Sequence, residues 1–171
     1  PIVQIVFPIG QDFFHFDTPF TQTTGGTQLD SDTRWQKMYR TGVDLLIEAI
    51  EKCRKIAQVI VVWCPGNHDQ MLSYTAVIGL SHVYSRTQDV SVDISPTPRK
   101  YVQWGKVLLG YSHGREEGKR INSLMQVEAP QQWAESEFRE WHMGDLHHEA
   151  VREEGGIVFR IISTITAADA W

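Results

Sequence analysis

Two short apolar runs, separated by one long amphipathic segment, constrain the fold of this chain more than any other feature. Residues 2–8 are mostly β-branched and apolar, and residues 57–64 are apolar almost throughout. Between them, apolar side chains recur at helical spacing at Val43, Leu46, Ile47 and Ile50. This spacing predicts a helix over about 34–56. A strand, a helix and a second strand in that order predict two parallel strands that are neighbours in one sheet.

The rest of the chain predicts shorter elements. A polar stretch at 17–33, rich in Thr, Gly and Asp, predicts a long loop, and Asp32 or Thr33 is expected to cap the helix that follows it. A second helix is expected over about 70–85. Further strands are expected at 90–94, 100–104, 106–111, 148–153 and 157–165, and a helical region interrupted by Pro130 at 119–137. The fold class is therefore α/β, a layered sandwich whose second half is more antiparallel.

The length of 171 residues fits a single domain over residues 1–171. The chain starts at Pro1, directly before an apolar strand, and ends in TAADAW without a polar tail. Since natural domain ends are usually polar and exposed, we expect a fragment of a longer polypeptide, truncated at both ends.

Composition limits the partners and the location. No apolar run approaches the roughly 20 residues that a membrane-spanning helix needs, so no membrane partner is expected. Cys53 and Cys64 form no CxxC pattern, which favours the cytoplasm. The net charge of −5 argues against a surface that binds nucleic acid by charge alone. Bound divalent cations would still allow a polyanionic substrate.

Four polar islands, at 10–17, 64–70, 111–114 and 144–149, each follow an expected strand. They contain or adjoin six of the seven histidines, which are His15, His68, His113, His142, His147 and His148. Carboxylate, amide and imidazole groups are the ligands that Mn²⁺ and similar cations accept. Because the carboxyl ends of parallel strands share one edge of a sheet, the islands predict a metal site at such an edge.

These islands resemble the blocks of the calcineurin-like metallophosphoesterases, in a form typical of phages and bacteria. The pattern of that family runs D-x-H, G-D, G-N-H-[DE], a histidine beside glycine, and G-H-x-H. Residues 10–12 (GQD) resemble the second block, 66–69 (GNHD) match the third in full, and 144–147 (GDLH) resemble the fifth. His113, followed by glycine, matches the fourth block. The resemblance implies a layered α/β/β/α sandwich and a hydrolase that cleaves phosphoesters.

The same resemblance implies the metal ligands. Asp12 would bridge two metal ions, Asn67 and His113 would bind one of them, and His147 would bind the other. Asp145 stands where the family has histidine, and a carboxylate can replace it on Mn²⁺ or Mg²⁺. Two divalent cations are therefore expected, with Mn²⁺ first and Mg²⁺, Fe or Zn²⁺ as alternatives. No D-x-H precedes Asp12 and the second block is GQD instead of GD, so this chain could hold only one of the two.

The expected catalytic residues lie beside these ligands. His68 would act as the general acid next to the scissile phosphate, and Asp69 would orient it. The stretch DFFH at 12–15 resembles the nuclease branch of the superfamily, in which a histidine three positions after the bridging Asp contacts the phosphate. That role would fall to His15 and would make a phosphodiester, with nucleic acid first, the expected substrate.

Three alternatives remain open. The domain could be a catalytically impaired module that binds nucleic acid or protein, or an enzyme that uses one metal. Residues 67–69 could be only a polar turn that caps the next helix. Some side chains have a simpler structural interpretation: His82 and His142 as structural or surface residues, His148 as exposed, Phe13, Phe14, Phe16, Trp133 and Trp141 as core, and Glu116 with Glu117 as a solvated turn.

Overall fold

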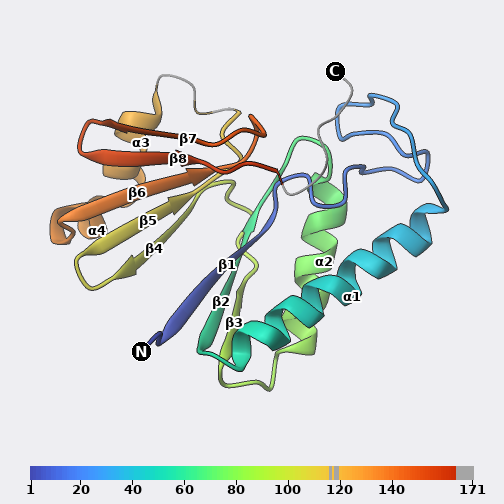
Figure 1. Ribbon diagram of the computed structural model, residues 1–171, viewed down its shortest axis with the longest axis horizontal. Helices are drawn as coiled ribbons and strands as arrows, with labels where there is room; N and C mark the ends of the chain where they lie inside the picture. Colours follow the sequence, from blue (N-terminus) through green and yellow to red (C-terminus); the bar gives the residue numbers. More distant parts are fainter. Residues whose placement is uncertain (116, 118–119, 165–171) are drawn as a thin grey trace. The chain divides into compact units, whose positions relative to one another are not determined.

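The computed structural model describes residues 1–115, 117 and 120–164. The chain divides into two compact units, Pro1–Pro98 and Arg99–Trp171, and each unit contains one sheet (Figure 1). The described residues form eight strands and four helices. The mixed α/β class predicted from the sequence is thereby confirmed.

The first unit is a parallel three-stranded sheet with two helices. Its elements are β1 (Gln4–Gly10), α1 (Trp35–Arg54), β2 (Gln58–Cys64), α2 (Gln70–Val83) and β3 (Val90–Asp93). The strand order is β1-β2-β3, and β1 pairs with β2 from Gln4 opposite Gln58 to Gly10 opposite Cys64. Both helices lie on the same face of the sheet (Figure 1). The predicted strand–helix–strand unit is confirmed.

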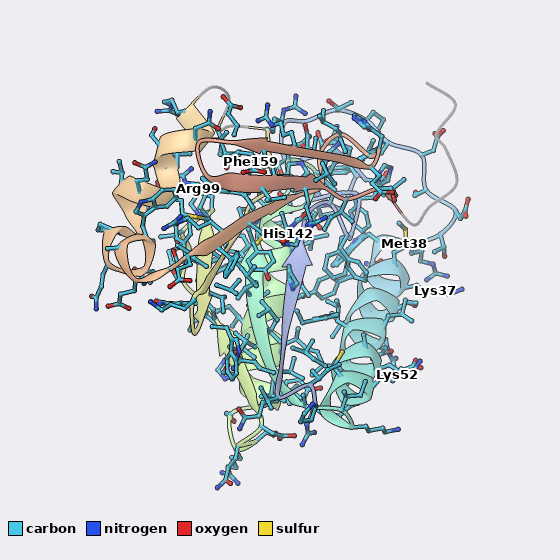
Figure 2. All side chains as sticks on the ribbon, turned by 60° about the vertical axis from the view of Figure 1, so that its left-hand side comes forward. Lys37, Met38, Lys52, Arg99, His142 and Phe159 are labelled. Carbon is cyan, nitrogen blue, oxygen red and sulfur yellow. The ribbon has the colours of Figure 1, made fainter. Side chains whose placement is uncertain are left out.

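The core of this unit forms between that face and the two helices. Ile50 of α1, Val61 of β2 and Val77 of α2 are completely buried together. Lys52, two residues further along α1 and so on the other side of the helix, is exposed and extends into solvent (Figure 2). Among the expected core aromatics, Phe14 and Phe16 are buried, but Phe13 is 44% exposed. The core interpretation is therefore wrong for Phe13.

The loop at 17–33 contains no strand or helix and carries one isolated bridge, between Gln22 and Gln28. It does not cap α1 as predicted. The residue at the helix start is Arg34, whose backbone is extended and whose side chain makes no capping hydrogen bond. Asp32 or Thr33 as a cap is therefore wrong, because the capping position is Arg34, one residue after Thr33 and two after Asp32.

The second unit is a mixed five-stranded sheet. Its elements are β4 (Lys100–Trp104), β5 (Val107–Tyr111), α3 (Ile121–Glu128), α4 (Pro130–Glu135), β6 (Phe138–Met143), β7 (Ala150–Glu154) and β8 (Ile157–Ile161). The order is β4-β5-β6-β8-β7. Residues 119 and 165, expected at the ends of a helix and a strand, lie outside the described residues.

Pairing in this sheet is antiparallel only at the two sides, in β4–β5 and β7–β8. The central pairs β5–β6 and β6–β8 are parallel. The more antiparallel character predicted for this half is found in these two hairpins. The sequence does not predict the parallel centre, which arises because α3 and α4 form a crossover between β5 and β6. Pro130 begins α4 at a position where its missing N–H costs no helical hydrogen bond.

Trp141, Phe159, Leu108 and Met125 fill the core of the second unit and are completely buried. The indole N–H of Trp141 donates to Ser112 Oγ at 3.0 Å, which satisfies its polar atom inside the core. Trp133 packs at the margin of this cluster. Trp141 is thus a core residue, as predicted, whereas Trp133 is only half-buried.

Glu117 differs from its expected place in a solvated turn. Its side chain is only 4% exposed, and its Oε1 lies 4.0 Å from Arg99 Nη1. The solvated interpretation is therefore wrong for Glu117, while Glu116 lies outside the described residues.

None of the helices in the described part of the chain is both long enough and apolar enough to span a bilayer.

Candidate functional site

Two loops leave the sheet of the first unit side by side at the carboxyl ends of β1 and β2. Gly10 and Cys64 are the last paired residues of these strands. The backbone pairing continues one step further, because the Gln11 N–H donates to Cys64 O at 2.8 Å. The loops that carry Asp12 and Asn67 therefore begin in contact, as expected from a parallel pair.

The turn after β1 has an unusual backbone. Gln11, Asp12 and His15 have φ values of 54°, 68° and 66°, in the left-handed region that few non-glycine residues adopt. Hydrogen bonds from Phe13 N to Gly10 O and from His15 N to Asp12 O close the turn on itself. Such conformations persist where surrounding contacts hold them, and they are concentrated at functional sites.

The Asp12 side chain lies against the loop of residues 66–69. Its Oδ1 accepts a hydrogen bond of 2.8 Å from the His68 backbone N–H. A Cβ atom on Gly66 would lie 1.9 Å from the same oxygen, so no other residue fits without displacing Asp12. The structure thus brings together two motifs that are more than 50 residues apart in the sequence, and it explains why this position is glycine.

The His68 ring is oriented by the turn of residues 10–15. Its Nδ1 lies 3.2 Å from the backbone carbonyl oxygen of His15. Because a carbonyl oxygen only accepts, Nδ1 carries the hydrogen and Nε2 is the second, separate position on the ring. The His15 and His68 rings have centroids 5.4 Å apart and are tilted by 44°. Two imidazoles therefore lie next to each other beside Asp12.

Asp69 makes a different contact from the one expected of a residue that orients His68. Its side chain is completely buried, and its Oδ2 accepts a hydrogen bond of 2.9 Å from the Phe14 backbone N–H. Burial raises the pKa of the Asp69 carboxyl from 3.8 to about 7, and the nearby Asp12 and Asp17 charges add to the increase. In this structure Asp69 connects the turn after β1 to the start of α2.

Asp17 is a residue of this site that the sequence does not single out. It is 4% exposed, its Oδ1 accepts from the Leu72 N–H at 2.8 Å, and its Oδ2 accepts from Thr24 Oγ1 at 2.7 Å. Leu72 lies in the first turn of α2, so Asp17 satisfies a helix N–H that usually bonds to a capping side chain. Asp69, at the capping position itself, makes no such bond. The interpretation of 67–69 as only a capping turn is therefore wrong.

The second unit carries the other expected ligands, at the ends of β5 and β6. The His113 side chain is buried, and its Nε2 lies 3.2 Å from Asp145 Oδ1. The backbone N–H groups of Gly144 and Asp145 both donate to the His113 carbonyl, at 3.1 and 3.0 Å. The Arg115 guanidinium lies 4.0 Å from the same Asp145 oxygen. His113 and Asp145 are thus placed together by backbone contacts between neighbouring parallel strands.

His147 lies in the same turn but is exposed. Its φ is 56°, and its N–H donates to Gly144 O at 3.1 Å. His148 is exposed as expected, with Nδ1 at 2.9 Å from Leu146 O. The turn therefore presents two imidazoles to solvent.

The structural interpretation fits the histidines outside these loops. His142 stacks on Tyr111 at 5.3 Å, and its Nε2 lies 3.3 Å from Glu140 Oε2. Burial lowers the pKa of His142, although Glu140 opposes the change. His82 is exposed on α2.

The expected ligands thus fall into two groups. Asp12 and Asn67, with His15, His68 and Asp69, belong to the first unit, whereas His113, Asp145 and His147 belong to the second. Over residues 1–115, 117 and 120–164 there is no cluster of three or more His, Cys, Asp or Glu side chains that could hold a metal ion.

Two pairs of expected ligands, one in each unit, have donor atoms that a divalent cation accepts. Two ligand atoms at about 2.1 Å from one cation lie roughly 3.0–3.5 Å from each other. The 3.2 Å separation of His113 Nε2 and Asp145 Oδ1 has this value. Asp12 and Asn67 add carboxylate and amide oxygens, which hard cations accept.

Comparisons of the chain with protein-family models, with curated proteins and with solved structures find no match.

Proposed function

We propose that this protein is a metal-dependent phosphoesterase, a hydrolase that cleaves phosphodiesters, with nucleic acid as the first candidate substrate. The proposal includes the layered α/β/β/α arrangement that the motif resemblance implies.

One observation carries this proposal: the fit between the Asp12 turn and the loop of residues 66–69. Asp12 Oδ1 accepts the His68 N–H at 2.8 Å, and Gly66 leaves no space for a side chain between them. A turn that only caps a helix needs no carboxylate held this close to its backbone. It also needs no neighbouring turn with three left-handed residues, such as the turn of residues 10–15. A site that must hold a carboxylate in a fixed position beside an imidazole benefits from both.

The residues that would hold the cations are Asp12, Asn67, His113, Asp145 and His147. Mn²⁺ is the first candidate, because the set mixes carboxylate, amide and imidazole donors. Divalent cations bound there would supply Lewis-acid activation of water and of the phosphoryl group.

The protein's own groups would then handle the proton and the substrate. The His68 ring, with its Nδ1 hydrogen directed at the His15 carbonyl, can present Nε2 to a leaving-group oxygen and donate a proton when the ring is charged. The exposed His15 ring, 5.4 Å from the His68 ring, can contact a phosphate oxygen. Asp69 would support both through the Phe14 backbone.

The experiment is hydrolysis of bis(p-nitrophenyl) phosphate in the presence of Mn²⁺. Asp12→Ala and His68→Ala should each lower kcat by about 10²–10⁴-fold, the usual contribution of a positioned proton donor or metal ligand. His82→Ala, an exposed histidine on α2, is the matched control and should retain activity. Unchanged turnover in both site variants would refute the proposal.

Calorimetric titration with Mn²⁺ separates this function from a non-catalytic module. The enzyme should bind Mn²⁺ and lose affinity in the Asp12→Ala variant. A protein that binds nucleic acid but takes up no Mn²⁺ would instead be the binding module. Anomalous scattering that shows one occupied position would identify a single-metal enzyme.

A further inference from the structure

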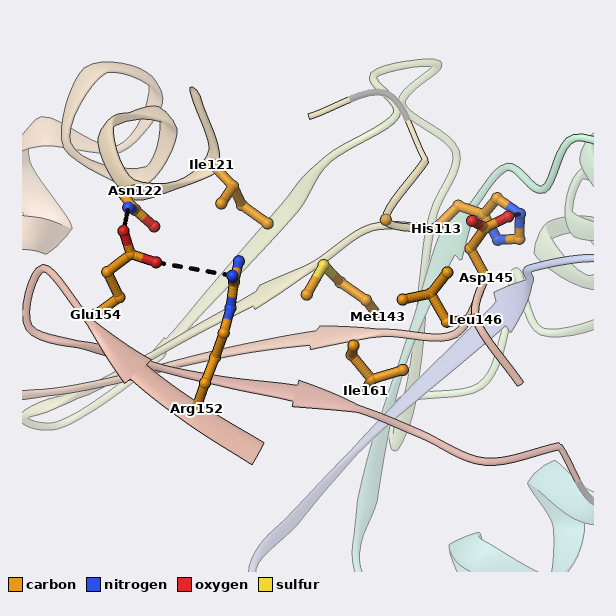
Figure 3. Close-up of a pocket in the computed structure, with 10 residues that line it drawn as sticks. His113, Ile121, Asn122, Met143, Asp145, Leu146, Arg152, Glu154 and Ile161 are labelled. Carbon is orange, nitrogen blue, oxygen red and sulfur yellow. Dashed lines mark hydrogen bonds and ion pairs between the residues drawn. The ribbon is translucent and has the colours of Figure 1, made fainter. Parts of the chain in front are cut away.

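The second unit contains a pocket of about 610 Å³ (Figure 3). Two of the expected metal ligands, His113 and Asp145, form only part of its lining. It is lined by described residues of α3, the end of β6, the turn at 144–146, β7 and the end of β8. Small-molecule sites usually have volumes of roughly 300–1,000 Å³. The pocket therefore has room for a group much larger than a phosphate.

The middle of the pocket is apolar. Ile121, Met143, Leu146 and Ile161 line it, and Figure 3 shows their side chains between two polar ends. Ile121 and Met143 are buried, whereas Leu146 is 55% exposed and leaves this part of the wall open to solvent. Such a surface favours a weakly polar body, because apolar area is removed from water on binding.

One polar end combines a cation, an anion and an amide. Arg152 Nη1 lies 3.7 Å from Glu154 Oε2, and the Asn122 amide nitrogen donates to Glu154 Oε1. The Asn122 side-chain oxygen Oδ1 is buried and has no hydrogen-bond partner among the described residues. This end of the pocket therefore holds one unsatisfied acceptor.

The charges at this end decide what it can accept. A phosphate would meet the Glu154 carboxylate, and an ammonium group would meet the Arg152 guanidinium. A neutral group with donors and acceptors along one edge would satisfy Asn122, Arg152 and Glu154 together. The edge of a nucleobase has this character, and its ring faces can contact the apolar middle of the pocket.

The other end of the pocket is formed by His113 and Asp145, which belong to the proposed metal ligands. We propose that the pocket binds the nucleobase of a nucleotide substrate, with its phosphoester at the His113 end and its base edge at Asn122, Arg152 and Glu154. This inference rests on the proposed function and specifies its substrate as a nucleoside phosphodiester.

The first test is equilibrium binding of free nucleosides, which contain no phosphate and need no catalysis. Adenosine, guanosine, cytidine and thymidine are titrated into the protein and followed by NMR. At least one should bind with a Kd of about 0.1–1 mM, as expected for a fragment of this size.

Glu154→Gln should weaken nucleoside binding at least fivefold, because it replaces the acceptor for the base edge. Glu153→Gln is the matched control, since neighbouring residues of a strand point to opposite faces. No binding of any nucleoside, or equal affinities in both variants and the wild type, would overturn the inference.

The second test compares the p-nitrophenyl ester of thymidine 5′-phosphate with bis(p-nitrophenyl) phosphate. The ratio of their kcat/KM values should fall at least fivefold in Glu154→Gln and stay unchanged in Glu153→Gln. An unchanged ratio in Glu154→Gln would overturn the base pocket and leave the phosphoesterase standing. Nucleoside binding without hydrolysis of either ester would overturn the phosphoesterase and leave the pocket standing.

Discussion

The two units hold their expected site residues in different ways. In the first, Asp12 and His68 are fixed by backbone: left-handed residues, a glycine without space for a Cβ, and buried carboxylates that accept main-chain N–H groups. In the second, the Gly144 and Asp145 backbone N–H groups donate to the His113 carbonyl, and the His113 and Asp145 side chains also contact each other. His147, in the same turn, is exposed.

In the first unit, the positions of the site residues are fixed before any ligand binds. In the second unit, a bound ligand would have to order the exposed His147. A carboxylate that already accepts a backbone N–H loses little freedom on binding a cation, whereas an exposed imidazole must be ordered at that moment. We therefore expect variants of the first unit to affect folding and activity together, and variants of the second to affect metal affinity.

The largest expected effect is on metal affinity in the second unit. Asp145→Ala removes the carboxylate beside His113 and should weaken Mn²⁺ binding by about 100-fold, in line with other losses in a metal site. His148→Ala, three residues away and exposed, is the control. Calorimetric titration measures both, and equal affinities would show that Asp145 is only a hydrogen-bond partner of His113.

In the first unit, we expect a substitution beside Asp12 to lower the stability of the protein. Gly66→Ala places a Cβ against Asp12 Oδ1 and Asp12 N, and it should lower the free energy of unfolding by about 1–3 kcal/mol. Gly79→Ala is the matched control, because a Cβ at this helical position meets nothing within 4 Å. That variant should be stabilised by about 0.5–1 kcal/mol. Denaturant unfolding gives both values, and a neutral Gly66→Ala would break the comparison between the units.

Asp17 and Asp32 test which carboxylate of the first unit supports a helix. Asp17→Ala leaves the Leu72 N–H without its acceptor and should cost about 1–2 kcal/mol. Asp32→Ala should change stability by less than about 0.5 kcal/mol, because Asp32 is exposed and makes no capping bond. Equal losses in both variants would contradict the assignment of Asp17 as the acceptor for α2.

The smallest effect concerns pH and the second unit. The folded protein lowers the pKa of His142 through burial beside Tyr111, Glu140 and Arg160. The unfolded chain therefore binds a proton at higher pH than the folded protein, and His142 makes stability fall as pH falls below about 6.5. His142→Gln should reduce this loss. Melting temperatures at pH 5 and pH 7.5 measure it, and an unchanged difference would exclude His142 as its source.

The sequence predicts the helices and most strands of the described structure, because these have an apolar period or a turn signal at their ends. It predicts no bounds for β6 (Phe138–Met143). The parallel centre of the second sheet could not be predicted in the same way. Short strands of mixed polarity look alike in both directions, and only the crossover through α3 and α4 sets the direction of β6.

The candidate site, like the fold, could be predicted only in part from the sequence. The match of residues 66–69 to a known motif, directly after an apolar strand, predicts that Asn67 and His68 follow a strand end. The contacts of Asp69 with Phe14 and of Asp17 with Leu72 could not be predicted, because both join residues 55 positions apart. Capping rules consider only neighbours in sequence, and at α2 a tertiary contact from Asp17 replaced the local cap.

The bond from Asp17 to α2 also has a practical consequence for anyone who redesigns this protein. Surface loops are usually the first segments to be shortened, exchanged or used as insertion points. Here the segment at 17–33 supplies the acceptor for the first turn of a helix, and its Thr24 hydroxyl accepts the Gln70 N–H. Deleting or grafting it would leave N–H donors in the first turn of a distant helix without their acceptors.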